Sequence, residues 1–260
     1  NRYSIPALIC DFLPRTYGQG TGSDMMKMRQ MVVFLSVLIV AHCGNTGLYD
    51  EAIAVYPRVV RPGLNEWFPL ANSLVRRVGV SDATATGAFT GGTNRAGEAG
   101  KALCVNSVRL DLTSTNFGAS PFSVSLWFKL NVVPASINTV WQKGTAMTFW
   151  NGLRFNQDNA NSFIITYGNG ASGSNLSHPS VAAATWYHMA FTYDGSAGTL
   201  YMAPYGGSLS KYGPTTGNYA QNAAALQINP GTLNMCVDDL LHYNRALHAD
   251  EVQQNFESLE

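Results

Sequence analysis

The residues that could hydrolyse a sugar are carboxylates, and they are scarce in the middle of this sequence. Between Asp111 and Asp238 the acidic side chains are Asp158 and Asp194 alone, with no Glu. A glycosidase places two carboxyl groups about 5–5.5 Å apart for retention, or about 6.5–9.5 Å apart for inversion. Asp238 and Asp239 are adjacent, and adjacent side chains on a strand point to opposite faces. The spacing therefore argues against glycoside hydrolysis and predicts no catalytic residue.

Histidine and cysteine spacing matches no common site either. No two His residues have the i, i+4 spacing of a helical zinc site, and no Cys-x-x-Cys pair occurs. The residues concerned are His42, His178, His188, His242 and His248, with Cys10, Cys43, Cys104 and Cys236. The sequence also lacks a Gly-x-Ser-x-Gly elbow and a phosphate-binding glycine loop. These patterns predict no cofactor.

The elements that position these residues are short strands. We expect strands bounded by turn residues over 122–129, 139–142, 153–156, 162–167, 185–193, 199–203 and 236–243. Asp194-Gly195, between two of them, is the strongest short hairpin signal. A helix is predicted only over 249–256, where Val252 and Phe256 lie four residues apart on one face. Many short strands without a βαβ rhythm favour an antiparallel sandwich.

The composition excludes several classes of protein. The 260 residues include 16 basic and 16 acidic side chains, so the formal net charge is zero. Nucleic-acid binding needs a surplus of Lys and Arg to displace counterions, and this chain has none. Hydrophobic residues make up 46% of the chain, which argues against disorder and predicts a compact fold of one or two domains.

The segment 25–44 has the layout of a secretory signal peptide. Two positive charges precede the apolar run 31–40, and small residues follow it. The run is too short for a transmembrane helix, which needs about 20 residues. This layout predicts secretion, with residues 1–24 as a preceding leader. The alternative is that residues 32–40 form a buried strand, because a short apolar run does not distinguish the two.

Residues 45–63 are expected to form a linker or an edge strand. A brief apolar stretch here lies before Pro57 and Pro62, and proline is confined to the edges of sheets. We therefore expect the folded domain to span residues 64–260.

Four segments in this domain resemble a known family. The first segment is 67–73 leading to 97–106, and the second is 122–128. The third is 185–201, which contains WYHMAFTYDG at 186–195. The fourth is 237–252, which contains DDLLHYNRALHADEV at 238–252. In this order they resemble the laminin-G-like domains of the concanavalin A-like lectin/glucanase class. The resemblance implies an all-β fold: an antiparallel two-sheet jelly-roll sandwich with a short C-terminal helix. The chain departs from the family at 201–207, where the usual turn is rebuilt, and at His248, a poor helix cap.

The resemblance also implies a disulfide and allows a metal. Cys104 and Cys236 lie on strands that are adjacent in this family, so we expect a disulfide between them. Its alternative is two buried free thiols. Family members often hold a calcium ion at the rim, for which Asp238 or Asp239 could serve as a ligand. We also expect Arg245 to reach back to one of these carboxylates, with Leu247 anchoring the helix.

Glycan binding would use aromatic side chains in polar loops. Sugar faces stack on Trp and Tyr, while polar side chains hydrogen-bond the hydroxyl groups. The candidate ligand-binding residues, in or near polar and Gly-rich loops, are Trp150, Asn151, Tyr205, Tyr212 and Tyr219. Asn175-Leu-Ser is an N-glycosylation acceptor in a polar segment, which is compatible with secretion.

Together these patterns predict a non-catalytic extracellular binding module. The expected partner is a glycan or a glycoprotein or other protein, as in cell adhesion, and not a nucleic acid. The competing interpretation is a structural or assembly subunit that uses the sandwich as a scaffold. A glycoside hydrolase is the least favoured, because paired carboxylates are missing from the central strands.

Overall fold

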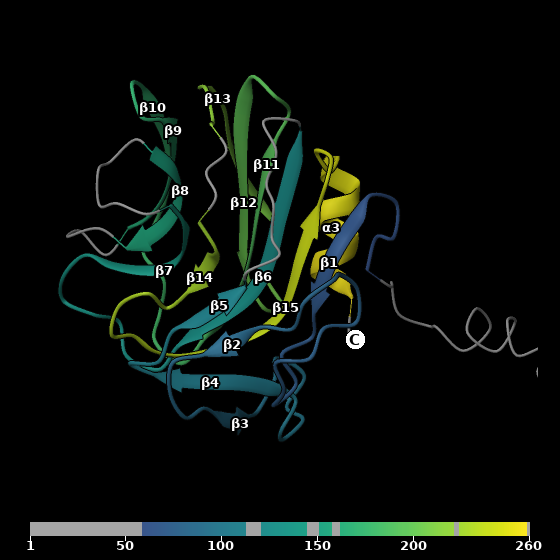
Figure 1. Cartoon of the computed structure of the whole chain (residues 1–260), viewed down its shortest axis with the longest axis vertical. Coiled ribbons are helices and arrows are strands. Elements are labelled where there is room, and N and C mark those ends of the chain that lie inside the picture. The colour runs from purple at the N-terminus through teal and green to yellow at the C-terminus, as the bar shows by residue number, and fades with distance from the viewer. Residues whose placement is uncertain (1–58, 113–120, 145–150, 158–161, 221–223, 259–260) are drawn as a thin grey trace, which may run out of the picture. The chain divides into compact units, whose positions relative to one another are not determined.

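The computed structural model describes residues 59–112, 121–144, 151–157, 162–220 and 224–258 (Figure 1). They belong to one compact unit, Tyr56–Glu260. The leader 1–24, the signal-peptide-like segment 25–44 and most of 45–63 lie outside the described residues, so these assignments stay predictions. Within the described part of the chain, no helix reaches the length and hydropathy that a membrane span requires.

Two antiparallel sheets make up the domain, as the sequence predicts. The eight-stranded sheet has the order β13-β12-β11-β6-β15-β4-β3, with β1 also paired to β15. Its strands are β1 Leu64–Phe68, β3 Thr90–Gly92, β4 Ala102–Asn106, β6 Phe122–Leu130, β11 Trp186–Tyr193, β12 Ala197–Pro204, β13 Ser210–Thr216 and β15 Asn234–Tyr243.

The seven-stranded sheet has the order β10-β9-β8-β7-β14-β5-β2. Its strands are β2 Thr84–Ala85, β5 Leu110–Leu112, β7 Asn138–Lys143, β8 Asn151–Gln157, β9 Phe163–Asn169, β10 Gly173–His178 and β14 Leu226–Ile228. One short helix, α3 Ala249–Glu257, follows β15.

The hydrophobic core lies between the sheets. Strand β6 alternates as predicted, and its inward residues Phe122, Val124, Leu126 and Phe128 are buried in this core. From the opposite sheet, Phe155 and Phe163 meet Phe128 at ring distances of 5.6 and 5.7 Å. Burying large aromatic side chains dominates the stability of such a core.

The outer face of the eight-stranded sheet is covered by α3, which lies beside β1 and β15 (Figure 1). Phe256 stacks on Trp127 with ring centres 5.4 Å apart, and Val252 is fully buried. Val59 and Val60, which the sequence analysis places in the linker, are buried in the same cluster. The packed domain therefore begins before residue 64.

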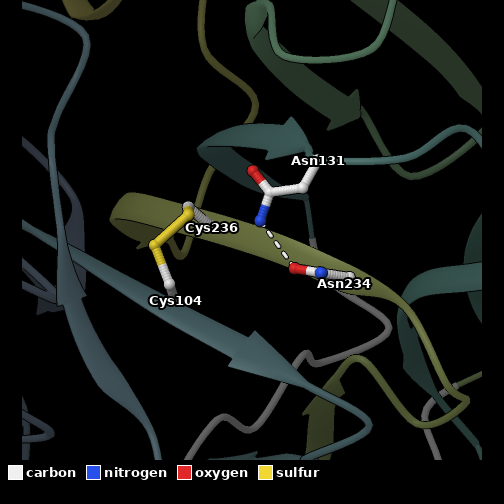
Figure 2. The surroundings of a disulfide bond; sticks show 4 residues. All are labelled: Cys104, Asn131, Asn234 and Cys236. Carbon is white, nitrogen blue, oxygen red and sulfur yellow. Dashed lines mark hydrogen bonds between the residues drawn. A yellow bond between two sulfur atoms is a disulfide. The ribbon is translucent and has the colours of Figure 1, made fainter.

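A disulfide joins Cys104 on β4 to Cys236 on β15, which confirms the expected pairing (Figure 2). The two residues face each other directly across the antiparallel pair. To the right of the bond in the same view, the Asn131 side-chain amide donates a hydrogen bond to Asn234 Oδ1 at 2.6 Å. On the adjacent strand, a Cβ added to Gly92 would overlap the sulfur of Cys104, so the disulfide requires glycine there.

Candidate ligand-binding face

The paired acids of β15 are structural, and the expectation that they point to opposite faces is wrong. A register shift between Asp238 and Leu241 marks a β-bulge, and Asp239 has φ +43°. A bulge places two residues opposite one and redirects a side chain. Both carboxylates therefore reach the Arg95 guanidinium, with N–O distances of 2.6 Å to Asp238 and 2.9 Å to Asp239.

Arg95, which the sequence analysis did not identify, takes the role expected of Arg245. It also donates to the Ser258 carbonyl at 2.8 Å and lies over the Trp127 ring. Arg245 instead forms an ion pair with Glu251 at 2.6 Å. Leu247 is buried as expected.

The same contacts make these acids unsuitable for calcium. Both side chains are at most 3% exposed, and a guanidinium already fills the space between the two carboxylates. The Trp67 ring nitrogen donates a further hydrogen bond to Asp239 at 3.1 Å. No group of three or more His, Cys, Asp or Glu in the described ranges is arranged to hold a metal ion.

A Ser–His pair on the outer face of the eight-stranded sheet is sealed from solvent. Ser125 Oγ lies 2.8 Å from His188 Nε2, and both residues are 1% exposed. Burial, and secondarily the positive charge of Arg95, lowers the pKa of His188 to about 3. With Trp127 and Phe256 packed against its ring, His188 belongs to the structural core under α3.

The outer face of the seven-stranded sheet carries a different arrangement. Residues in direct cross-strand register form one line over β5, β14, β7, β8, β9 and β10. We call this line the polar row, and it consists of Asp111, Gln227, Gln142, Arg154, Thr166 and Asn175. Every member is half-buried except Asn175, which is exposed. At the usual strand spacing the row is about 24 Å long.

Hydrogen bonds order one end of the polar row. The Gln142 amide donates to Gln227 Oε1 at 3.0 Å, and the Gln227 amide donates to Asp111 Oδ1 at 3.1 Å. Arg109 holds the other carboxylate oxygen of Asp111 at 3.0 Å. The side chains at this end are thus fixed in orientation before any ligand arrives.

Arg154 occupies the middle of the polar row. Its sequence neighbours Leu153 and Phe155 are buried in the core, so its own side chain lies on the outer face. Its cross-strand neighbours are Gln142 and Thr166, and neither carries a charge. Burial lowers the pKa of the Arg154 guanidinium from its ordinary value. In the described ranges, no carboxylate or other hydrogen-bonding group contacts it.

The aromatic candidates from the sequence do not gather at one place. Trp150 lies outside the described residues, and Asn151 begins β8 opposite Asn169. Tyr205 is 47% exposed and meets Trp127 edge-on at 5.9 Å, on the eight-stranded sheet. Tyr212 is half-buried with its ring 5.1 Å from that of His178.

The expectation that Tyr219 binds a ligand from a surface loop is wrong, because its side chain is buried. It is 5% exposed, and its ring packs 5.1 Å from that of Phe122. Burial raises the pKa of its hydroxyl well above the ordinary value. The Gly-rich surroundings suggested a loop tip, but the segment folds back between the sheets and donates its backbone N–H to the Tyr193 hydroxyl at 3.3 Å.

The sequence matches the Laminin_G_3 family, described as the concanavalin A-like lectin/glucanases superfamily, over residues 106–253. The chain belongs to this superfamily. Among curated protein sequences none matches it significantly. Laminin-G-like domains closed by a disulfide are typical of extracellular proteins.

Several solved structures share the fold. The binding domain of botulinum neurotoxin DC in complex with SialylT aligns with a TM-score of 0.59 and 14% identity, covering 76% of this chain and 51% of its own. The same domain in complex with rat synaptotagmin II aligns with a TM-score of 0.59 and 14% identity, covering 77% of this chain and 53% of its own. A Trypanosoma rangeli sialidase in complex with sialic acid aligns with a TM-score of 0.53 and 18% identity, covering 79% of this chain and 36% of its own.

These likenesses bear on the fold rather than on a shared ligand. The chain spans only about half of the neurotoxin chains, at 51% and 53%, and about a third of the sialidase, at 36%. Because one neighbour is a sialidase, the laminin-G-like sandwich also occurs within an enzyme, so fold alone does not separate binding from catalysis.

Proposed function

We propose that this laminin-G-like domain is an extracellular glycan-binding module that holds its ligand on the polar row. The observation that carries the proposal is the register of the row: carboxylate, amide, guanidinium and hydroxyl side chains lie side by side across β5, β14, β7, β8 and β9, next to the acceptor Asn175 on β10. Together these groups supply both hydrogen-bond donors and acceptors, which the hydroxyl groups of a sugar require. Structural neighbours that bind SialylT and sialic acid support a glycan as the ligand class.

The position of α3 favours this face over the other. Val252 and Phe256 of α3 pack on the outer face of the eight-stranded sheet, where Phe256 stacks on Trp127 and Val252 joins the apolar cluster over β1, β11 and β15. The corresponding face of the seven-stranded sheet is half-exposed and polar along the row. A long ligand would therefore lie across strands β7 to β9, in the middle of the row and around Arg154.

Trp150 and Asn151 are proposed to border the same site. They directly precede and begin β8, the strand that carries Arg154. An indole there could stack on a sugar ring held by the row. Tyr205 and Tyr212 lie on other surfaces and are not part of this proposal.

Secretion is the second part of the proposal. The disulfide between Cys104 and Cys236 persists in oxidising compartments, and cytosolic proteins seldom keep such a bond. The signal-peptide-like segment 25–44 and the acceptor at Asn175 agree with this compartment. Cell adhesion fits an extracellular module whose partner is a glycan or glycoprotein.

A glycan array tests the function. The full chain, expressed in secreting cells and treated to remove N-glycans, is applied with calcium and with a chelator. We expect binding in both conditions. The double variant Gln142→Ala/Gln227→Ala should weaken it at least about fivefold, since each lost hydrogen bond contributes about 1 kcal/mol.

Tyr205→Ala is the matched control, because Tyr205 is exposed on the other sheet. It should bind as the unaltered chain does. Loss of binding in Tyr205→Ala with full binding in the glutamine variant would move the site to the other sheet. If the unaltered chain binds no glycan at all, the proposal fails and a scaffold role replaces it.

A further inference from the structure

Arg154 is unusual among the arginines of the domain. Four others each form an ion pair with a carboxylate: Arg76 with Asp82, Arg95 with Asp238 and Asp239, Arg109 with Asp111, and Arg245 with Glu251. Arg61 and Arg77 lie over the ring of Trp67. Arg154 has neither kind of partner in the described part of the chain, although it is half-buried.

Among the described residues, no neighbouring group neutralises the charge of Arg154. The carboxylate of the polar row, Asp111, lies three strands away, which is about 14 Å at the usual strand spacing. That distance exceeds the screening length of about 8 Å in physiological salt. Asp111 is also already bound by Arg109 and Gln227. The middle of the row is therefore a partly desolvated positive site with neutral polar neighbours.

We propose that Arg154 binds the carboxylate of an acidic sugar, so that the ligands of this face are carboxylate-bearing oligosaccharides. This inference rests on the proposed glycan-binding function and adds the class of ligand. The guanidinium is planar and offers two parallel N–H groups, which match the two oxygens of a carboxylate. A single partly buried cation also balances one negative charge, whereas a phosphate carries nearly two.

The neighbours of Arg154 complete the site. Gln142 and Thr166 flank it directly, and Asn156 follows two residues further along β8 on the same face. All three are half-buried and polar. They can hydrogen-bond hydroxyl groups of the sugar while the carboxylate is held, and none of them repels a negative ligand.

Paired oligosaccharides that differ only in the carboxylate test the inference. Titration calorimetry with the full chain compares 3′-sialyllactose with lactose, and a glucuronate-containing tetrasaccharide with its carboxyl-reduced form. The unaltered chain should prefer the acidic member of at least one pair, and the pair concerned identifies the source of the carboxylate. Arg154→Gln should remove that preference, lowering affinity for the acidic member roughly 10- to 100-fold, as expected for charged hydrogen bonds.

Two further variants distinguish the effect of the planar guanidinium geometry from the effect of its positive charge. Arg76→Gln changes the net charge equally but removes an arginine that pairs with Asp82 outside the polar row, so it should leave the preference intact. Arg154→Lys keeps the charge and loses the planar fork, so it should restore only part of the affinity.

The outcomes are distinct. Equal affinity for acidic and neutral members in the unaltered chain, or an unchanged preference in Arg154→Gln, overturns the role of Arg154 while glycan binding stands. Failure of the unaltered chain to bind any of the four sugars overturns the glycan-binding function and this inference together.

Discussion

At the scale of single residues, Asp238 and Asp239 share one guanidinium in a place that water does not reach. Two carboxylates against one Arg95 would leave a net buried negative charge, which is costly. Burial, and then the neighbouring Asp239, raises the pKa of Asp238 to about 8 against the opposing effect of Arg95. A proton kept on Asp238 makes the cluster neutral.

This cluster predicts how stability depends on pH. Between an unfolded pKa of 3.8 and a folded pKa of about 8, the folded chain keeps a proton on Asp238 that the unfolded chain has lost. The free energy of unfolding therefore falls as pH rises through this range, by at most about 1.4 kcal/mol per pH unit. His188 has the opposite effect, raising the free energy of unfolding as pH rises, but only between about pH 3 and pH 6.5. The decrease should thus be clearest between pH 6.5 and 8.

Asp238→Asn tests this prediction, because asparagine imitates the protonated acid. Denaturant unfolding of the variant should show less decrease in stability between pH 6.5 and 8 than the unaltered chain. Asp250→Asn, at an exposed position of α3, serves as the control and should keep the original slope. Identical slopes in all three proteins would show that Asp238 is ionised throughout.

At the scale of elements, alternation and turn chemistry predict β6 to β9, β11, β12 and β15, whereas short or polar strands such as β10, β13 and β14 are not expected. The strand expected at 122–129 is found at Phe122–Leu130, and the helix expected at 249–256 is found at Ala249–Glu257. The hairpin at Asp194 forms because its carboxylate accepts from the Ser196 and Ala197 backbone at 2.8 Å. These signals are local, so the sequence contains them.

The features that sequence reasoning missed depend on contacts between distant segments. The bulge at Asp239 and the reach of Arg95 across 143 residues to Asp238 leave no local pattern. The polar row was missed for the same reason. Gln142 and Arg154 belong to separate expected strands, Gln227 lies on β14, where no strand is expected, and only the register of the sheet aligns the three.

Strand β10 carries a prediction about modification. Asn175 and Ser177 are exposed while Leu176 between them is 5% exposed, so the acceptor and its hydroxyl both face solvent. We expect an N-glycan at Asn175 when the chain is secreted from eukaryotic cells. Intact mass before and after enzymatic deglycosylation measures it, with Asn175→Gln as the control. A single unmodified mass would contradict the prediction.

At the scale of the whole molecule, the disulfide between Cys104 and Cys236 links residues 132 positions apart. Closing so long a loop restricts the unfolded chain, which in the chain-entropy model stabilises the fold by about 4–5 kcal/mol. The double variant Cys104→Ala/Cys236→Ala should lose most of this, seen as a lower denaturant midpoint. The unaltered chain under reducing conditions should approach the same value, and a midpoint insensitive to both changes would contradict the prediction.

Strand β15, which is central in the eight-stranded sheet, is the last strand of the described chain. It pairs with β6, β4 and β1, holds one half of the disulfide and presents Asp238 to Arg95. During synthesis, every strand it joins leaves the ribosome before it does. The edges of β6 and β4 that pair with β15 therefore stay unpaired in the nascent domain until residues Asn234–Tyr243 emerge. Such open edges pair readily with other chains, so this strand order exposes the nascent domain to aggregation until β15 pairs.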